Sequence, residues 1–225
     1  MESSLYKQFD NIILLDLETT GLDSRREEII ELAALRLESG EKTARPENEM
    51  DYLIKQSQGK TLPADIVRLT GITPEMLEAD GVSKKAACDA FCKLLTCSKP
   101  LIVAYNAQFD LCFLYYFLKS FGRAELLRNI KMLDALTVYK DRRPYPHTLS
   151  AAVEEYSVQT QNTHRAIDDV RATSELLEAM EREDDDLNRY INLFGFNPRY
   201  GVSGPRISSI TYKPQPYNSP KKIYE

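Results

Sequence analysis

The sequence predicts a mixed α/β fold in which a five-stranded sheet is flanked by helices. Two short runs of the 225-residue chain, residues 11–18 and 100–106, are apolar on both faces, the pattern of central strands that are covered on both sides. The first half of the chain predicts strands joined by turns, whereas the second half alternates strands with helices. A meander followed by strand–helix alternation implies a sheet with both antiparallel and parallel neighbours.

Local signals place the elements in chain order. Gly21 and the charged turn after it separate the first two strands, Gly71 separates two short helices, and Ser83 caps a longer helix. The expected strands cover about residues 11–18, 29–38, 50–55, 100–106 and 130–133. Helices are expected on both sides of Gly71, from about 83 to 97, after Asn106, at about 134–140, from about Leu149, and from about His164 to 184.

The chain is long enough for one ample core, which we expect within residues 1–184. Residues 185–225 are expected to form an extended C-terminal tail. Beyond residue 197 the chain holds five Pro and four Tyr with little periodicity, so this part is predicted to be extended or partly disordered.

Bulk composition is that of an ordinary soluble globular protein, with 43% apolar and 28% charged residues. No apolar run is long enough to span a membrane, and the amino terminus lacks a basic start followed by an apolar stretch. The four cysteines form no C-x-x-C pair and are expected to be small core residues in a reducing compartment. Together these features predict a cytoplasmic protein.

Charge is distributed unevenly along the chain. The net charge of −5 argues at first against a polyanionic partner. Residues 119–143 carry seven Lys/Arg against three Asp/Glu, however, and residues 198–225 carry five against one. Two basic segments on an acidic body suit a local polyanion site, although charged faces are usually only solvated. Within the first segment, Lys140, Arg142 and Arg143 are expected to face the polyanion.

Two carboxylates interrupt the first apolar strand. Asp16 and Glu18 point the same way, because strand side chains repeat with a period of two, and they lie roughly 6.6–6.8 Å apart along the strand. Like charges at the end of a buried strand repel each other and cost solvation energy. A divalent cation would compensate for this cost; the plainer alternative is a strand that ends in a polar turn.

Two further acids lie at the starts of expected helices. Asp110 begins the helix after the second apolar strand, where it could also complement the helix dipole. In the last helix, Asp169 falls on the apolar stripe with Ala166 and Thr173, whereas Asp168 falls on the polar face. Asp169 is therefore the acid predicted to face the interior.

Three short motifs in the sequence resemble those of a known enzyme family. "DLETTGLD", "NAQFD" and "HRAIDD" resemble the signature motifs of the DEDD-type 3′–5′ exonucleases, in the subclass whose third motif contains His, which includes the proofreading epsilon subunit of bacterial DNA polymerase III. The resemblance covers about residues 10–180, so residues 1–184 would be the exonuclease domain. "LTGIT" at 69–73 favours the proofreading branch. Three motifs in order, with every acid present, are far more specific than one.

The resemblance implies an RNase H-like fold and a site for two divalent metal ions, Mg²⁺ or Mn²⁺. The implied metal ligands are Asp16, Glu18, Asp110 and Asp169. Beside these acids, His164 would be the general base. The residues implied to bind the terminal nucleotide are Thr19, Leu22, Asn106, Phe109 and His164. Tyr105 departs from the family pattern, in which many relatives have His before the Asn.

The implied activity is removal of nucleoside 5′-monophosphates from the 3′ end of DNA, at single-stranded or frayed ends. The alternative within the same chemistry is an exoribonuclease or oligoribonuclease that trims RNA ends. A different class is a catalytically idle module that docks on a DNA polymerase or a sliding clamp, for which "INLFGF" at 191–196 is a faint signal; packing of Leu193 and Phe194 on the body is the favoured interpretation. The tail after residue 197 is expected to be dispensable for bond cleavage.

Overall fold

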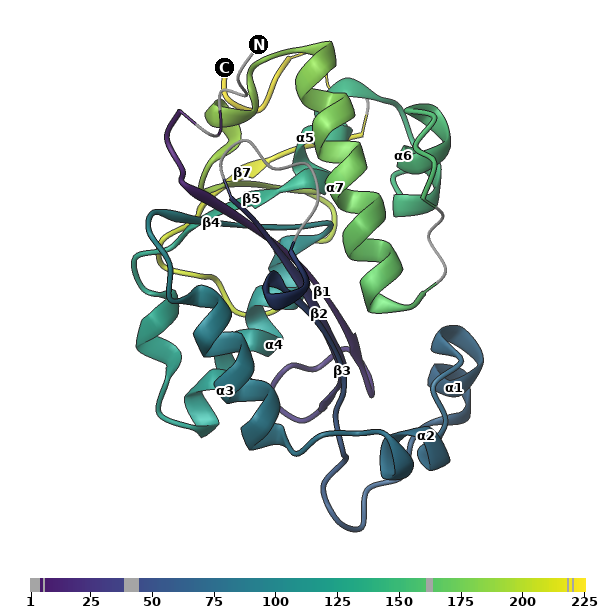
Figure 1. Ribbon diagram of the computed structural model, residues 1–225. Helices are drawn as coiled ribbons and strands as arrows, with labels where there is room; N and C mark the ends of the chain where they lie inside the picture. The colour runs from purple at the N-terminus through teal and green to yellow at the C-terminus, as the bar shows by residue number, and fades with distance from the viewer. Residues whose placement is uncertain (1–4, 6, 39–44, 161–163, 218, 220) are drawn as a thin grey trace.

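A five-stranded mixed sheet forms the centre of the protein in the computed structural model (Figure 1). The structure describes residues 5, 7–38, 45–160, 164–217, 219 and 221–225. The strand order is β3-β2-β1-β4-β5. β1 (Asn11–Thr19), β2 (Ile29–Glu38) and β3 (Glu49–Leu53) form an antiparallel meander, and β1, β4 (Pro100–Ala104) and β5 (Lys131–Asp134) run parallel. The mixed five-stranded sheet is confirmed.

Helices cover both faces of this sheet (Figure 1). α3 and α4 lie on one face, α5, α6 and α7 lie on the other, and the short α1 and α2 lie beyond β3. None of the helices among the described residues is long and apolar enough to cross a membrane. The bounds are α1 (Ala64–Thr70), α2 (Pro74–Ala79), α3 (Lys84–Leu95), α4 (Ala107–Ser120), α5 (Ala135–Arg142), α6 (Leu149–Glu155) and α7 (Ala166–Glu183).

The alternation of β1 divides the apolar residues into two cores. Ile13 and Leu15 pack with α3 and α4, whereas Ile12 and Leu14 pack with α5, α6 and α7. All four side chains are buried, as expected for a central strand with apolar residues on both faces. Asp16 continues the Ile12–Leu14 series, so the strand period directs its carboxylate toward the face that α7 covers.

The last long helix begins at Ala166, two residues later than predicted from the sequence. Its N-cap Arg165 is extended, and His164 has a φ of 59° in the left-handed region. Glu31 on β2 accepts a hydrogen bond from the Ala166 backbone N–H at 2.9 Å, which stabilises the first turn of the helix at this residue. His164 therefore lies on a turn ahead of the helix.

Residues 185–225 are mostly irregular, as their proline content predicts, but they pack on the body. They include three short elements: η3 (Leu187–Tyr190) and the parallel pair β6 (Leu193–Phe196) and β7 (Thr211–Pro214). Buried side chains from this segment join both cores; they are Leu187, Tyr190, Leu193, Phe194, Ile210 and Ile223. The preference for packing of Leu193 and Phe194 is thus confirmed, whereas the division of the chain at residue 184 stays a prediction.

Candidate active site

A cavity of about 440 Å³ lies where β1 and β4 end. It brings together residues from four stretches of sequence that are far apart in the chain. All four acids named by the motifs line it, together with His164, Asn106 and Phe109. The full lining is Asp16, Leu17, Glu18, Tyr105, Asn106, Phe109, Asp110, Thr148, Leu149, Ser150, His164 and Asp169. The four acids and the histidine of the three sequence motifs therefore line one cavity.

Helix phase distinguishes the two neighbouring acids of the third motif. Asp169 is 6% exposed and lines the cavity from α7. Asp168 is half-buried and forms an ion pair with Arg171, one turn further along the helix, at 3.8 Å. This confirms the prediction that Asp169 faces the interior and Asp168 faces the polar side.

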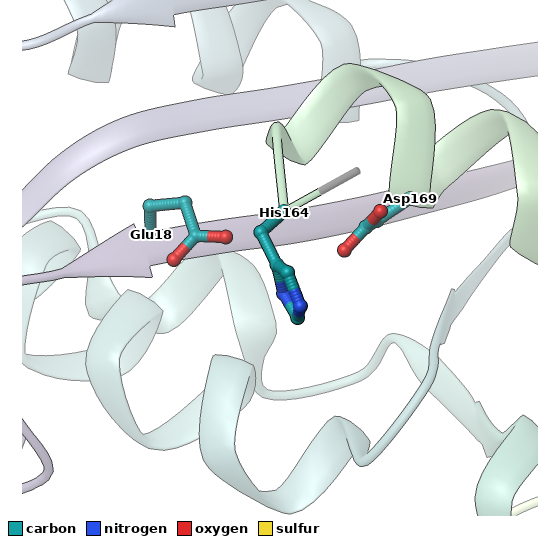
Figure 2. Close-up of side chains that lie close together, drawn as sticks. All are labelled: Glu18, His164 and Asp169. Atoms are coloured by element: carbon teal, nitrogen blue, oxygen red, sulfur yellow. The ribbon is translucent and has the colours of Figure 1, made fainter. Parts of the chain in front are cut away.

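His164 lies between two carboxylates (Figure 2). A ring nitrogen of His164, a carboxylate oxygen of Glu18 and a carboxylate oxygen of Asp169 all lie within 4.8 Å of one another. The three side chains come from β1, from the turn before α7 and from α7 itself, and they point toward one another. His164 is exposed, so its imidazole can reach both these acids and the solvent in the cavity.

Electrostatics in the cavity disfavour negative charge. Burial, followed by the neighbouring charges of Asp110 and Asp169, raises the pKa of Asp16 well above its ordinary value. Burial, followed by Glu31 and Asp169, raises the pKa of Glu18 to about 8. Burial also raises the pKa of Asp110, against hydrogen bonds from backbone N–H groups that lower it.

Burial is the largest cause of each raised pKa, and repulsion by neighbouring carboxylates adds to it. Four carboxylates offer hard oxygen ligands, which are the ligands that Mg²⁺ and Mn²⁺ prefer in proteins. A divalent cation would replace the protons and relieve the repulsion between the carboxylates. The donor set of this cavity therefore fits divalent cations.

Glu31 is a buried acid next to the cavity whose importance sequence reasoning missed. It is fully buried on β2, directly opposite Glu18 in the β1–β2 register. Its Oε1 accepts hydrogen bonds from Arg165 Nε at 2.8 Å and Arg165 Nη2 at 2.6 Å, and its Oε2 accepts one from the Ala166 N–H. These bonds fix the backbone that carries His164. The signal in the sequence was a charged residue inside a strand predicted to be buried.

Asp134 has a similar role on the other side of the cavity. Its Oδ1 accepts hydrogen bonds from the backbone N–H groups of Asn106 and Ala107, both at 3.0 Å. Its Oδ2 accepts hydrogen bonds from the N–H and the hydroxyl of Thr137, so it also caps α5. The Asn106–Asp110 motif is thereby tied to the end of β5.

Thr19 and Leu22 do not line the cavity, in contrast to the other residues that the motifs assign to nucleotide binding. Thr19 is buried, and its hydroxyl donates a hydrogen bond to the Gly21 carbonyl at 2.7 Å. Leu22 is 88% exposed in the loop after β1. Tyr105, which departs from the family pattern, does line the cavity, and its hydroxyl donates to the carbonyls of His147 and Thr148. Nucleotide contacts by Thr19 and Leu22 stay predictions.

Lys140 and Arg142 lie on α5 rather than in a loop, Arg143 caps its end, and none of the three lines the cavity. The expectation that this segment faces the polyanion is wrong for its arginines. The Arg142 side chain is 2% exposed and pairs with Asp186 at 2.5 Å and with Glu183 at 3.3 Å. Arg143 pairs with Glu155 and Glu183. Carboxylates from α6, α7 and the segment after it neutralise both arginines, and charge counting along the sequence could not show these partners.

The sequence of this chain matches a known protein family. The profile of the RNase T exonuclease family matches residues 13–177. This range contains all three motifs and the two buried acids Glu31 and Asp134. The chain belongs to this exonuclease family. The resemblance to the DEDD-type exonucleases is therefore confirmed, and the protein is an exonuclease by family.

Among curated relatives of this exonuclease are PolC-type DNA polymerases III. That of Thermotoga petrophila is 32% identical over 172 residues, and that of Bacillus subtilis is 31% identical over 178 residues. The alignments cover 75% and 77% of this chain but only 12% of each relative. The chain thus spans about an eighth of the length of these polymerases.

Solved structures of exonuclease I share the fold. The zinc-bound complex of E. coli exonuclease I with single-stranded DNA superposes with a TM-score of 0.71 at 21% identity, covering 81% of this chain and 43% of the other. The complex with a dA16 oligonucleotide gives the same TM-score and identity, covering 80% and 42%. This likeness confirms the RNase H-like fold.

Proposed function

We propose that this exonuclease removes nucleoside 5′-monophosphates from the 3′ end of DNA in a reaction that depends on divalent metal ions. The observation that carries the proposal is the meeting of four acids and one histidine, from three separate motifs, in one cavity. Support for DNA comes from the relatives, which are DNA polymerases, and from the fold neighbours, two of which are described with bound DNA.

In this proposal the acids hold two cations, Mg²⁺ or Mn²⁺, which would offset the burial and mutual repulsion that raise the pKa values of Asp16, Glu18 and Asp110. Such cations, when bound, would supply the Lewis-acid chemistry that phosphodiester hydrolysis needs. The cation ligands are Asp16, Glu18, Asp110 and Asp169. Protonation of these acids would compete with binding, so affinity for the cations should rise with pH.

His164 acts as the general base in the proposed reaction. Its exposed imidazole reaches the cavity from a turn that Glu31 and Arg165 hold in place, and imidazole chemistry suits proton transfer near neutral pH. A water loses its proton to His164 and attacks the terminal phosphorus. The bond from phosphorus to the 3′ oxygen of the preceding nucleotide then breaks, and that oxygen takes up a proton.

The substrate end is proposed to be single-stranded or frayed, as in proofreading or repair. Asn106 and Phe109 line the cavity at the start of α4 and would contact the terminal nucleotide, together with Thr19 at the end of β1 and Leu22 in the loop after it. Because the relatives are polymerases, a DNA polymerase or its sliding clamp is the proposed protein partner. The segment 191–196 does not provide the clamp contact, since Leu193 and Phe194 are buried.

The test is digestion of 5′-labelled DNA and RNA oligonucleotides with Mg²⁺, with Mn²⁺ and with a strong chelator. We expect DNA to shorten stepwise from the 3′ end, with nucleoside 5′-monophosphates resolved by chromatography, and no cleavage in the chelator. Asp16→Asn should be inactive, and Asp168→Asn is the matched control that should remain active. Cleavage that survives chelation would contradict the proposal, and digestion of RNA alone would replace DNA with RNA as the substrate.

A further inference from the structure

A second cavity, of about 550 Å³, lies beside α4. Its walls come from α4, from the short 3₁₀ helix η2 (Ala124–Leu127) and from tail residues 205–209. The lining includes Tyr115, Tyr116, Arg128, Arg206 and Ser208. None of these residues has a role in the proposed bond cleavage.

The two basic segments of the sequence converge on this second cavity. Arg128 belongs to the segment 119–143 and Arg206 to the segment 198–225, and both are exposed. Arg142 and Arg143 lie later in the first segment and are neutralised by carboxylates. One exposed arginine from each segment therefore lines this cavity, together with Glu125, on a protein whose net charge is −5.

Aromatic side chains are interleaved with this positive charge. The Tyr115 side chain is 41% exposed, and Lys119 Nζ lies 5.8 Å from the centre of its ring. Arg25 Nε donates a hydrogen bond to Tyr116 Oη at 3.0 Å. Because Arg25 belongs to the same loop as Leu22, this loop reaches from the end of β1 to the rim of the second cavity.

Residues of α4 line both cavities. Phe109 lines the acidic cavity and Tyr116 lines the second one. Seven residues are about two helical turns, so these side chains lie on the same side of the helix and about 10.5 Å apart along its axis. With about 3.4 Å between stacked nucleotides of one strand, that distance corresponds to about three nucleotides.

We propose that the second cavity is a binding subsite for single-stranded polynucleotide, about three nucleotides upstream of the 3′ end that occupies the acidic cavity. Tyr115 and Tyr116 offer ring faces on which any base can stack, and Arg128 and Arg206 pair with the phosphates. This inference rests on the proposed exonuclease function. It predicts that strands long enough to reach the second cavity bind more tightly than dinucleotides, without sequence preference.

The test compares the double variant Arg128→Gln/Arg206→Gln with the wild type on oligothymidylates of two and eight nucleotides. We expect kcat/KM on the octamer to fall on the order of tenfold and its salt slope to drop by about 1.4, which corresponds to two lost phosphate contacts. Cleavage of the dimer should be unchanged. Arg182→Gln, on the exposed part of α7, is the control that should change neither substrate.

Binding of the same labelled oligonucleotides, followed by fluorescence anisotropy in chelator, separates this inference from the proposed function. If the protein binds the octamer through these arginines but cleaves nothing, the proposed function is wrong and the subsite is still supported. Equal octamer binding by wild type and double variant would overturn the subsite. The single variant Arg128→Gln leaves the contact of Arg206 with the Tyr212 ring in place, so it controls for a folding defect in the double variant. It should show a smaller loss of octamer binding than the double variant.

Discussion

Replacing Asp169 with asparagine is expected to stabilise the metal-free protein and to abolish metal-dependent turnover. Ligand atoms of Asp169 and Glu18 lie within 4.8 Å. Two unit charges at that distance repel by about 1 kcal/mol in water and by about 3.5 kcal/mol at an effective dielectric constant of 20. Removing one charge should therefore raise the free energy of unfolding by about 1–3 kcal/mol, or the melting temperature by about 2–12 °C for a chain of this size.

The assay is thermal unfolding of wild type, Asp169→Asn and Asp168→Asn well above the Glu18 pKa of about 8, where both charges are present, each in chelator and across a Mg²⁺ titration. Saturating Mg²⁺ at 100 times its dissociation constant would stabilise the wild type by about 2.7 kcal/mol, and this gain should vanish in Asp169→Asn. Asp168→Asn removes a half-exposed pair with Arg171, so its stability should change by less than about 0.5 kcal/mol. Its turnover should stay within a few-fold of the wild type.

Opposite behaviour of the two variants would refute the reasoning. If Asp168→Asn lost turnover and the Mg²⁺-dependent shift while Asp169→Asn kept both, the ligand would lie on the other face of α7. If Asp169→Asn destabilised the metal-free protein, repulsion would not be what dominates the cavity. Hydrogen bonding of the Asp169 carboxylate would then outweigh its charge.

Three further outcomes are expected. His164→Ala should lower kcat by roughly 10²–10⁴-fold with KM little changed, and an unaltered pH–rate profile in the variant would remove His164 from its role as base. In chelator, the metal-free protein should lose stability as pH rises from 4.5 to about 8, because native Glu18 keeps a proton that the unfolded chain has released; chemical denaturation at stepped pH should show this slope, and Glu18→Gln should flatten it. Deletion of residues 198–225 should lower the melting temperature sharply, since each buried isoleucine removed costs about 2–5 kcal/mol; calorimetry showing an unchanged transition would mean that the tail packing contributes little.

Much of the fold could be predicted because local patterns and tertiary structure agree. β1 is apolar on both faces and lies at the centre of the sheet. Gly71 ends α1 with a φ of 70°, and the Ser83 hydroxyl accepts the Ala86 N–H at the start of α3. Helix phase alone separated Asp169 from Asp168. In these places a single physical rule decides the outcome, so one sequence is enough.

The packing of the tail and the partners of the basic segment could not be predicted, because both depend on contacts between residues far apart in sequence. The tail has no periodicity, yet Gln215 Nε2 donates to the Thr137 carbonyl at 2.9 Å and the Ile223 N–H donates to Asp141 at 2.6 Å. Arg142 lies in a basic run, but its partners come from the end of α7 and the segment after it. Hydrogen bonds and ion pairs between residues far apart in sequence leave no local pattern, so charge counts misplaced the polyanion surface.

The contrast between Glu31 and Asp16 shows how a buried acid can be assigned a role. Both lie on neighbouring strands at the centre of the sheet. Glu31 receives two bonds from a guanidinium and one from a helix N–H, so its charge is compensated within the protein. Every influence on Asp16, from burial to its four acidic neighbours, raises its pKa. An acid with internal donors has a structural reason to be buried, whereas an acid among like charges must be neutralised by a proton or by an external cation. By this criterion Glu31 positions the histidine turn, and Asp16 is the acid to test as a metal ligand.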